Sequence, residues 1–264
     1  MAHPPIEVKA MLFDTFGTIV DWRGSVIREL SQFGAVNGLS ADWAAFADRW
    51  RGRYQPQMER VRSGARPWIK LDELHREVLD ALLLEFGIAG PDEAQRRHLN
   101  KVWHRLDPWP DSVAGLTRLK RRCIIGPLSN GNLALLTNLA KQAGLPWDVI
   151  LATELSHSYK PQPQAYLGSS ALLDLAPHEV MMCAAHNDDL CAARALGMKT
   201  AFFPRPTEHG PGQQRDLDPS EAWDVVAVDI VDLADRMALD ARPAARIPDR
   251  PLGQTLSSGG KTKW

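Results

Sequence analysis

Asp14 is the residue of this chain best placed to act as a nucleophile. It directly follows an apolar run, residues 8–13, and precedes Thr15-Phe16-Gly17-Thr18. A carboxylate at the end of a buried strand can attack carbon or phosphorus and form a covalent intermediate. Asp14 could equally be a turn or helix-capping residue. Phosphate chemistry would favour a second carboxylate two positions on, where the chain has Phe16.

Three more polar segments follow later apolar runs. They are Ser129-Asn130-Gly131, Lys160 in the sequence SYKPQPQAY, and the run 184–189. The carboxyl ends of parallel strands share one edge of a sheet, so these segments and Asp14 would meet in one cleft. That cleft would combine carboxylates, a hydroxyl group and an ammonium group. Lys160 could instead be an exposed loop lysine, and Ser129-Asn130 a simple helix cap.

Short apolar runs predict the strands that position these groups. Each run has four to six residues, and several are apolar throughout, which is typical of strands buried on both faces of a parallel sheet. Helical patterns lie between the later runs, so we expect an α/β fold with a Rossmann-like, doubly wound sheet. The expected strands are 8–13, 123–128, 149–152, 180–185, 200–203 and 225–228, and the helices between them are 132–143, 163–173, 190–196 and 230–238.

The first two expected strands are too far apart for a single crossover. Residues 22–106 have helical periodicity, with helices expected at 24–34, 41–62, 70–86 and 92–106. We interpret them as a helical cap over the carboxyl ends of the strands. The expected domains are a Rossmann-like core of residues 1–21 and 107–242, the cap of residues 22–106, and a loose C-terminal extension of residues 243–264, rich in Pro, Gly and Ser.

The composition argues against several classes of protein. Its 31 basic and 32 acidic residues leave a net charge of −1 without a block of like charge, so we expect no nucleic-acid or membrane partner. No apolar stretch approaches about 18 residues, and the amino terminus does not resemble a signal peptide. The three cysteines are too scattered for a disulfide framework or a zinc site. These features predict a cytoplasmic protein.

The four polar segments, in this order, resemble the motifs of the haloacid dehalogenase superfamily over nearly the whole chain. The resemblance implies a Rossmann-like core, often with a cap inserted after the first strand. Most members are magnesium-dependent phosphotransferases that carry Asp-x-Asp and a further metal-binding Asp in the fourth segment. This chain has Phe16 and Ala185 at those positions. Phosphoryl transfer would lack its main charge stabilisation, so a phosphatase is an alternative only, with Asp188 as a substitute ligand.

A narrower branch, the type II 2-haloacid dehalogenases, is more similar. Its motif Asp-x-(Tyr/Phe)-Gly-Thr is residues 14–18, and its Ser-Asn-Gly is residues 129–131. Its Lys-Pro-x(4)-Tyr begins at Lys160 and ends at Tyr166, and its substrate-binding Arg after a Trp corresponds to Arg51. The resemblance implies attack on carbon without a metal or other cofactor, and a possible homodimer, since members commonly dimerise.

The resemblance also implies a role for each site residue. Asp14 would displace halide from C2 of a 2-haloacid, Lys160 would keep it ionised, and water near Asp189 would hydrolyse the ester. Arg51 would pull on the departing halide or clamp the substrate carboxylate. The other expected roles are substrate contact by Thr15, Ser129 and Asn130, apolar walls from Phe16 and Trp68, orientation of Lys160 by Tyr166, and bracing of the Asp14 loop by Thr18.

The fourth segment departs from the branch's usual Ser-Ser-Asn-x-x-Asp. Both serines are alanine, the Asn is His186, and Asp189 is retained. His186 could be a hydrogen-bonded structural residue. Alternatively, it could line the halide pocket or position water, and so favour a small leaving group such as fluoride.

We therefore expect a hydrolase that dehalogenates short 2-haloalkanoic acids, fluoroacetate among them, through an aspartyl ester. Its partners would be the small 2-haloacid and the released halide. Hydrolysis of another electrophile at C2, a magnesium-dependent phosphatase and a non-catalytic binding protein remain as alternatives. The presence of Asp14, Lys160, Ser129 and Asp189 together argues against a binding protein, because buried charges are costly to keep without a use.

Overall fold

The centre of the molecule is one parallel sheet. The computed structural model describes residues 6–239. Six strands lie in the order β5-β4-β1-β6-β7-β8, and every pairing between neighbours is parallel. This is the predicted doubly wound α/β fold, with each expected strand present. The strands are β1 (Ala10–Phe13), β4 (Ile124–Ser129), β5 (Leu151–Ala152), β6 (Val180–Ala184), β7 (Lys199–Phe202) and β8 (Val225–Val226).

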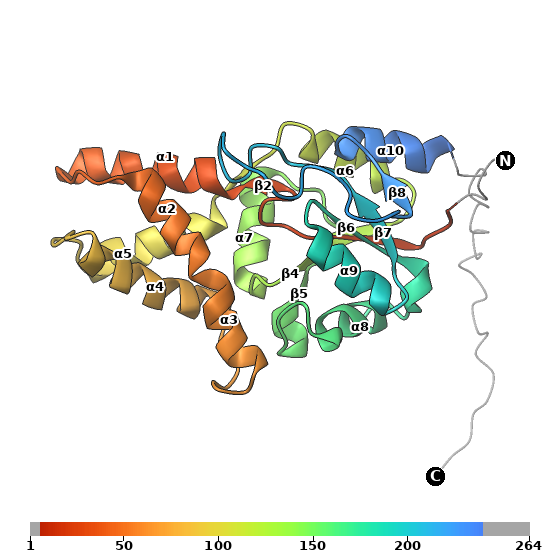
Figure 1. Cartoon of the computed structure of the whole chain (residues 1–264), viewed down its shortest axis with the longest axis horizontal. Helices are drawn as coiled ribbons and strands as arrows, with labels where there is room; N and C mark the ends of the chain where they lie inside the picture. Colours follow the sequence, from red (N-terminus) through yellow and green to blue (C-terminus); the bar gives the residue numbers. More distant parts are fainter. Residues whose placement is uncertain (1–5, 240–264) are drawn as a thin grey trace, which may run out of the picture.

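Helices cover both faces of this sheet (Figure 1). Along β1, Met11 and Phe13 belong to one buried apolar cluster, whereas Ala10 and Leu12 belong to a second cluster on the opposite face. Helices α6, α7 and α10 contribute to the first cluster and α8 and α9 to the second. These helices are α6 (Ser112–Leu119), α7 (Leu133–Ala143), α8 (Pro163–Ala171), α9 (Asn187–Ala195) and α10 (Ile230–Leu239), with short 3₁₀ helices η2 (Thr153–Ser156) and η3 (Pro177–Glu179).

A second group of helices lies beside the carboxyl edge of the sheet, at the left of Figure 1. The chain enters and leaves this inserted segment through two short strands that pair with each other in antiparallel fashion, Val20 with Pro108 and Asp21 with Asp107. The elements are β2 (Val20–Asp21), α1 (Trp22–Asn37), α2 (Trp43–Gly52), α3 (Tyr54–Arg62), α4 (Leu71–Glu85), α5 (Glu93–Asn100), the 3₁₀ helix η1 (Lys101–His104) and β3 (Asp107–Pro108). The division into core and cap domains stays a prediction, and the expected C-terminal extension lies outside the described residues.

One predicted helix of the cap was wrong in its extent. Residues 41–62 form two helices, α2 and α3, with Arg53 between them. Pro56 explains the break, because it lacks the N–H that would bond to the carbonyl of Gly52 and its ring crowds that carbonyl. The expected helix 92–106 likewise ends at Asn100 and continues as the 3₁₀ helix η1.

The apolar cluster on the α6–α7–α10 face continues into the cap. It runs from Met11 and Phe13 through Phe16 to Trp103 and the buried side of α2. Phe16 meets Trp103 edge to face with ring centroids 6.0 Å apart, and Trp103 lies 5.5 Å from Trp50. The loop that carries Asp14 is therefore packed between the sheet and the cap helices. Within residues 6–239, no helix has the length and apolar character needed to cross a membrane.

Candidate active site

The site lies where three neighbouring strands end. Asp14 follows β1, Ser129 closes β4 on one side of it, and His186 follows β6 on the other. Lys160 comes from the loop between η2 and α8. Its backbone N–H donates to Asn130 Oδ1 at 2.8 Å, which fixes the lysine loop to the end of β4. The sequence expectation that these segments meet at one edge is borne out by their positions.

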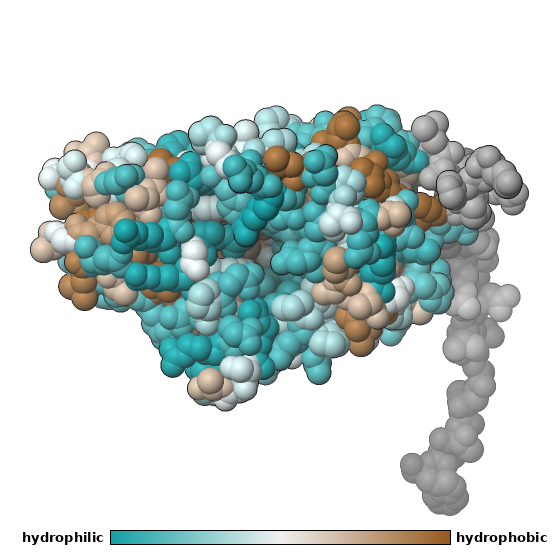
Figure 2. Space-filling model, in the orientation of Figure 1, coloured by the Kyte–Doolittle hydropathy of each residue, from teal (hydrophilic) through white to brown (hydrophobic). Residues whose placement is uncertain are grey.

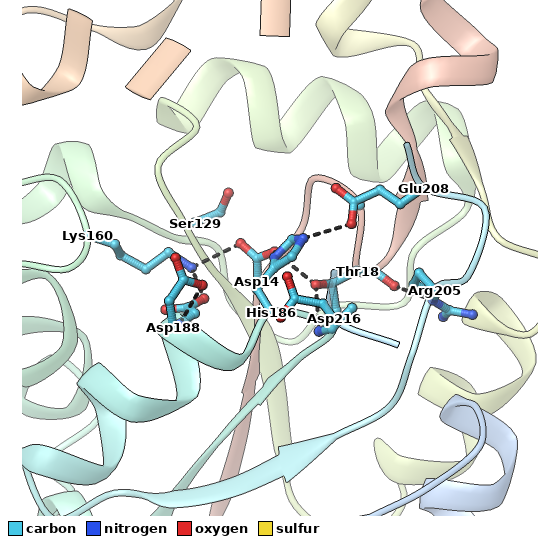
Figure 3. Close-up of polar contacts among 12 residues, drawn as sticks. Asp14, Thr18, Ser129, Lys160, His186, Asp188, Arg205, Glu208 and Asp216 are labelled. Carbon is cyan, nitrogen blue, oxygen red and sulfur yellow. Dashed lines mark hydrogen bonds and ion pairs between the residues drawn. The ribbon is translucent and has the colours of Figure 1, made fainter. Parts of the chain in front are cut away.

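The two oxygens of the Asp14 carboxylate have different partners (Figure 3). Lys160 Nζ donates to Oδ1 at 2.9 Å. Thr18 Oγ1 lies 2.9 Å from Oδ2, and His186 Nδ1 lies 3.1 Å from the same oxygen. Asp14 itself is 8% exposed, so these side chains replace most of its hydration.

The surroundings of Asp14 keep its carboxylate ionised. Burial by itself would raise the pKa of Asp14, but the charge of Lys160 and the hydrogen bond from His186 hold that pKa well below its usual value. The pKa of Lys160 is raised in turn, because Asp14 and Asp189 outweigh the effect of its burial. Asp14 is therefore an anion held among fixed donors, the state that nucleophilic attack requires.

Asp189 forms the second partner of Lys160. Its Oδ2 lies 2.5 Å from Lys160 Nζ, and the Tyr166 hydroxyl donates to its Oδ1 at 2.6 Å. Tyr166 was expected to orient Lys160; its hydroxyl contacts Asp189, which pairs with the lysine, and the orienting role stays a prediction. Burial and the negative charge of Asp14 raise the pKa of Asp189 against the opposing charge of Lys160. Of the two carboxylates, Asp189 is the stronger proton acceptor.

His186 bridges two carboxylates, one of which the sequence did not indicate. Its Nε2 lies 2.8 Å from Glu208 Oε2, while its Nδ1 faces Asp14. A neutral imidazole has one N–H, so only the imidazolium can donate to both acids. Burial would lower the pKa of His186, but the charge of Glu208 and the hydrogen bond to Asp14 raise it well above its usual value. The pKa of Glu208 falls to about 2, chiefly because the charge of His186 outweighs burial.

Glu208 is held in place by the segment between β7 and β8. Arg205 Nε donates to the Thr18 carbonyl at 2.9 Å, and its guanidinium binds both oxygens of Asp111 at 2.7 and 2.9 Å. Trp22 Nε1 donates to Glu208 Oε1 at 3.0 Å, and the Glu208 side chain is 1% exposed. Sequence analysis missed Glu208 because it lies in a stretch without apolar periodicity, where no motif of the family marks it.

A cavity of about 1000 Å³ opens over these groups. On the face drawn in Figure 2, mostly hydrophilic residues surround a hollow near the middle of the molecule. Arg51, from α2, lines the cavity with its guanidinium over the rings of Tyr54, at 4.4 Å, and Trp22, at 5.6 Å. Its Nη1 is buried and has no hydrogen-bond partner among residues 6–239. The predicted residues in the wall are Asp14, Phe16, Arg51, Asn130, Lys160, Tyr166, His186 and Asp189.

Three residues predicted to contact substrate do not line this cavity. Trp68 lies between α3 and α4, where it packs against the rings of Tyr159 and His157 at 4.6 and 5.5 Å. Trp22 takes the expected position of an apolar wall, because the start of α1 borders the cavity. Ser129 and Thr15 are buried behind the surface, at 0% and 1% exposure.

The residues of this site differ from those of a magnesium-dependent phosphatase at two positions, 16 and 185, where such an enzyme has carboxylates. Phe16 points into the aromatic cluster of the cap, and the backbone N–H of Ala185 donates to Thr18 Oγ1 at 3.1 Å. Asp188, the substitute ligand considered, accepts the N–H of Asp189 at 2.9 Å. In the described part of the chain, no group of three or more His, Cys, Asp and Glu side chains is arranged to hold a metal ion.

The fold and the site define a class of hydrolase. The sequence signature of the haloacid dehalogenase-like hydrolases matches residues 8–197, so the chain belongs to this family. It is 52% identical to the defluorinating L-2-haloacid dehalogenase Rha0230, whose crystal structure aligns with a TM-score of 0.86 over 89% of this chain and 99% of that chain. The L-2-haloacid dehalogenase PA0810 is 51% identical, with a TM-score of 0.86 over 88% and 99%.

Relatives known by sequence agree. (S)-2-haloacid dehalogenase 1 of Pseudomonas sp. (strain CBS-3) is 28% identical over 214 residues, which are 79% of this chain and 91% of that protein. The (S)-2-haloacid dehalogenase of Xanthobacter autotrophicus is 27% identical over 210 residues, 75% of this chain and 76% of that protein. The resemblance to the L-2-haloacid dehalogenase branch is thus confirmed.

Proposed function

We propose that this protein hydrolyses short L-2-haloalkanoic acids to 2-hydroxy acids and halide, with Asp14 as the nucleophile and without a metal. One observation carries the proposal. An ionised, almost fully buried carboxylate faces a cavity whose lining includes the apolar rings of Phe16 and Trp22 and the guanidinium of Arg51. Such a site suits an electrophilic carbon next to an anionic group.

The first step is a displacement at C2. One Asp14 oxygen forms a bond to C2 as the carbon–halogen bond breaks, and the halide leaves with that electron pair. Arg51 can bind the substrate carboxylate or the halide, because its Nη1 has no partner among the described residues. Lys160 keeps Asp14 ionised until the ester forms.

The second step is hydrolysis of the aspartyl ester. A water molecule adds to the Asp14 carbonyl carbon, and its proton passes to Asp189, whose pKa is raised. Collapse of the adduct breaks the bond to the product oxygen. Lys160 gives that oxygen a proton and takes one from Asp189, since its Nζ lies within hydrogen-bond distance of both acids. Asp14 is left as a carboxylic acid that carries the second proton of the water and releases it to solvent, so the products are the hydroxy acid, halide and one proton.

Fluoroacetate belongs among the proposed substrates. The 52% identical relative Rha0230 is described as defluorinating. In this chain, the cationic His186 lines the cavity next to Asp14; both of its N–H groups are bonded to Asp14 and Glu208, so it is the positive charge of the ring that would favour a small leaving group with concentrated negative charge. Exchanging His186→Asn is then expected to slow the first turnover of fluoride release from fluoroacetate more than that of chloride release from chloroacetate. An unchanged ratio between the two halides would remove this role for His186.

The experiment that tests the function is halide release in the presence of EDTA. The substrates are L-2-chloropropionate, chloroacetate and fluoroacetate, and Asp14→Asn is the control. Release that persists with EDTA and disappears in Asp14→Asn is the expected result. A folded protein that releases no halide, but turns over a phosphate ester with Mg²⁺ or another C2 electrophile, would replace the proposal with that activity.

We also propose a cytoplasmic location and a homodimer, both expected from the sequence or its resemblance. The molar mass in solution, measured by sedimentation equilibrium, checks the second of these. A mass near 29.3 kDa, the mass of one chain, would contradict the dimer.

A further inference from the structure

The two oxygens of Asp14 are surrounded by different donors. Among residues 6–239, Oδ1 has one partner, the Lys160 ammonium, whereas Oδ2 has two, the Thr18 hydroxyl and the His186 imidazolium. Each donor at Oδ2 also forms a second hydrogen bond, on its side away from Asp14. Thr18 Oγ1 accepts the N–H of Ala185 at 3.1 Å, and His186 is held by Glu208 at 2.8 Å.

We propose that Thr18 and His186, with Glu208 behind the histidine, form an oxyanion site for Asp14 Oδ2 in the hydrolysis of the aspartyl ester. This inference rests on the proposed function and concerns its second step. Glu208 has the role of a positioning residue, because it contacts His186 rather than Asp14. Oδ1, the oxygen with the single partner, is then the one that attacks carbon.

The electron movements follow from this assignment. After displacement, Oδ1 carries the substrate carbon and Oδ2 is the carbonyl oxygen of the ester. As water adds to the carbonyl carbon, the pair of electrons of the C=O double bond moves to Oδ2, and the water proton passes to Asp189. The negative charge therefore appears next to the donors from Thr18 and His186. When the C=O double bond forms again, the bond between the Asp14 carboxyl carbon and Oδ1 breaks. Oδ1 leaves as the hydroxyl oxygen of the product and takes its proton from Lys160.

This arrangement stabilises the transition state more than the ester. Ester formation neutralises Asp14, while the two cations that contact it remain: Lys160, which keeps Asp189 as a partner, and the His186 imidazolium, which keeps Glu208. The charge that develops on Oδ2 restores the missing anion beside the imidazolium. Donors fixed in advance at the point where charge develops are among the largest contributions to catalysis.

Glu208 is well suited to keep this histidine charged and oriented. Its carboxylate is 1% exposed, accepts from Trp22 Nε1 at 3.0 Å, and lies 3.5 Å from His209 Nε2. With Nε2 bonded to Glu208, the ring presents Nδ1–H to Asp14. The raised pKa of His186 keeps the ring protonated, so it cannot take a proton from water, which agrees with a role as donor and leaves proton removal to Asp189.

Rapid-quench kinetics with L-2-chloropropionate distinguishes the two steps. Free chloride reports displacement, hydroxy acid reports hydrolysis, and the intact mass of the quenched protein reports the ester on Asp14. In Glu208→Gln and in His186→Gln we expect a burst of about one chloride per protein, accumulation of the ester, and hydrolysis slower by roughly 100-fold. Glu221→Gln is the matched control, because Glu221 lies in the same loop but binds Arg194 at 2.8 Å, away from the cavity.

Each variant gives a decisive result on its own, so a failure of one to fold leaves the other to test the proposal. A fall in the rate of the chloride burst without accumulated ester would overturn the oxyanion site and leave only an effect on displacement. Unchanged hydrolysis would overturn it as well. Absence of chloride release from the unmodified protein is a different outcome, since it rejects the proposed function itself.

Discussion

Glu208 occupies the space that a side chain at residue 17 would need. A Cβ on Gly17 would lie 2.0 Å from Glu208 Oε1 and 2.2 Å from its carboxyl carbon, and Gly17 has a φ of +91°. The two residues are far apart in sequence, yet the carboxylate that binds His186 packs against the glycine of the Asp14 loop. The glycine of the motif thus makes room for a group that lies outside every motif.

Gly17→Ala is therefore expected to displace Glu208 and to slow turnover by at least roughly 10-fold, the effect of about 1.4 kcal/mol in the barrier. The positive φ adds about 1–2 kcal/mol to the loss of stability. Halide release and urea unfolding measure the two effects. Gly64→Ala is the control, because Gly64 has a φ of +76° with open space around it. Equal loss of activity in both variants would contradict the contact with Glu208.

Lys160→Met is expected to lower the free energy of unfolding by about 3–5 kcal/mol at neutral pH, because Asp14 and Asp189 lose their shared cation. The lowered pKa of Asp14 contributes stability above its unfolded value of 3.8, and the raised pKa of Lys160 contributes below its unfolded value of 10.5. The difference from the unmodified protein should thus be greatest between these values and shrink in acid.

Urea unfolding at several pH values checks the Lys160 prediction. Lys199→Met is the matched control, since Lys199 forms an exposed pair with Asp224 at 3.3 Å and should change stability little. A Lys160→Met protein as stable as the Lys199→Met protein would mean that the buried triad is not ionised as described.

Arg51→Lys is expected to reduce kcat/KM by roughly 10- to 100-fold, because an ammonium cannot stack on the rings of Trp22 and Tyr54 or offer an anion the paired N–H donors of a guanidinium. Steady-state kinetics also identifies what Arg51 binds. A higher KM with unchanged kcat indicates the substrate carboxylate, and a lower kcat indicates the departing halide. Arg53→Lys, which alters an exposed partner of Glu85 in the same region, should leave both constants unchanged.

The pH dependence of stability tests the charge of Glu208. Its pKa falls from 4.5 to about 2 on folding, which corresponds to roughly 3 kcal/mol of stabilisation at most. A lowered pKa contributes stability that is complete above pH 4.5 and is lost as the pH falls toward 2. The Glu208→Gln protein should lose this part of the acid sensitivity. Parallel stability curves for the two proteins between pH 5 and pH 2 would contradict the assignment.

The sequence predicted most of the fold because buried parallel strands leave a strong local signal. Runs such as 180–185 are apolar on both faces, and the structure has a strand at each of them. The errors occur where local signals compete. Helical periodicity continues across residues 41–62, and Pro56 interrupts it without changing the pattern of apolar residues. The two-residue strands β2 and β3 are too short to have a periodicity at all.

The sequence predicted only those site residues whose distance along the chain from a strand indicates where they lie. Asp14, Lys160 and Asp189 could be placed at one edge because each follows a strand. Glu208 could not, because its position depends on the contacts of Arg205 with Thr18 and Asp111, which the sequence does not encode locally. The prediction that Trp68 lines the cavity was wrong for a related reason: the sequence does not show toward which of its neighbours the side chain of a loop residue turns.

The apolar cluster shared by the sheet and the cap has a consequence for unfolding. Met11, Phe16 and Trp103 belong to the same continuous set of contacts as the buried side of α2, so neither part can lose its packing without exposing the other. The inserted helices and the sheet should melt in one cooperative transition rather than in two. Phe16, the residue that stands in place of a phosphatase's second acid, is thus also a structural bridge through which damage to distant helices would reach Asp14.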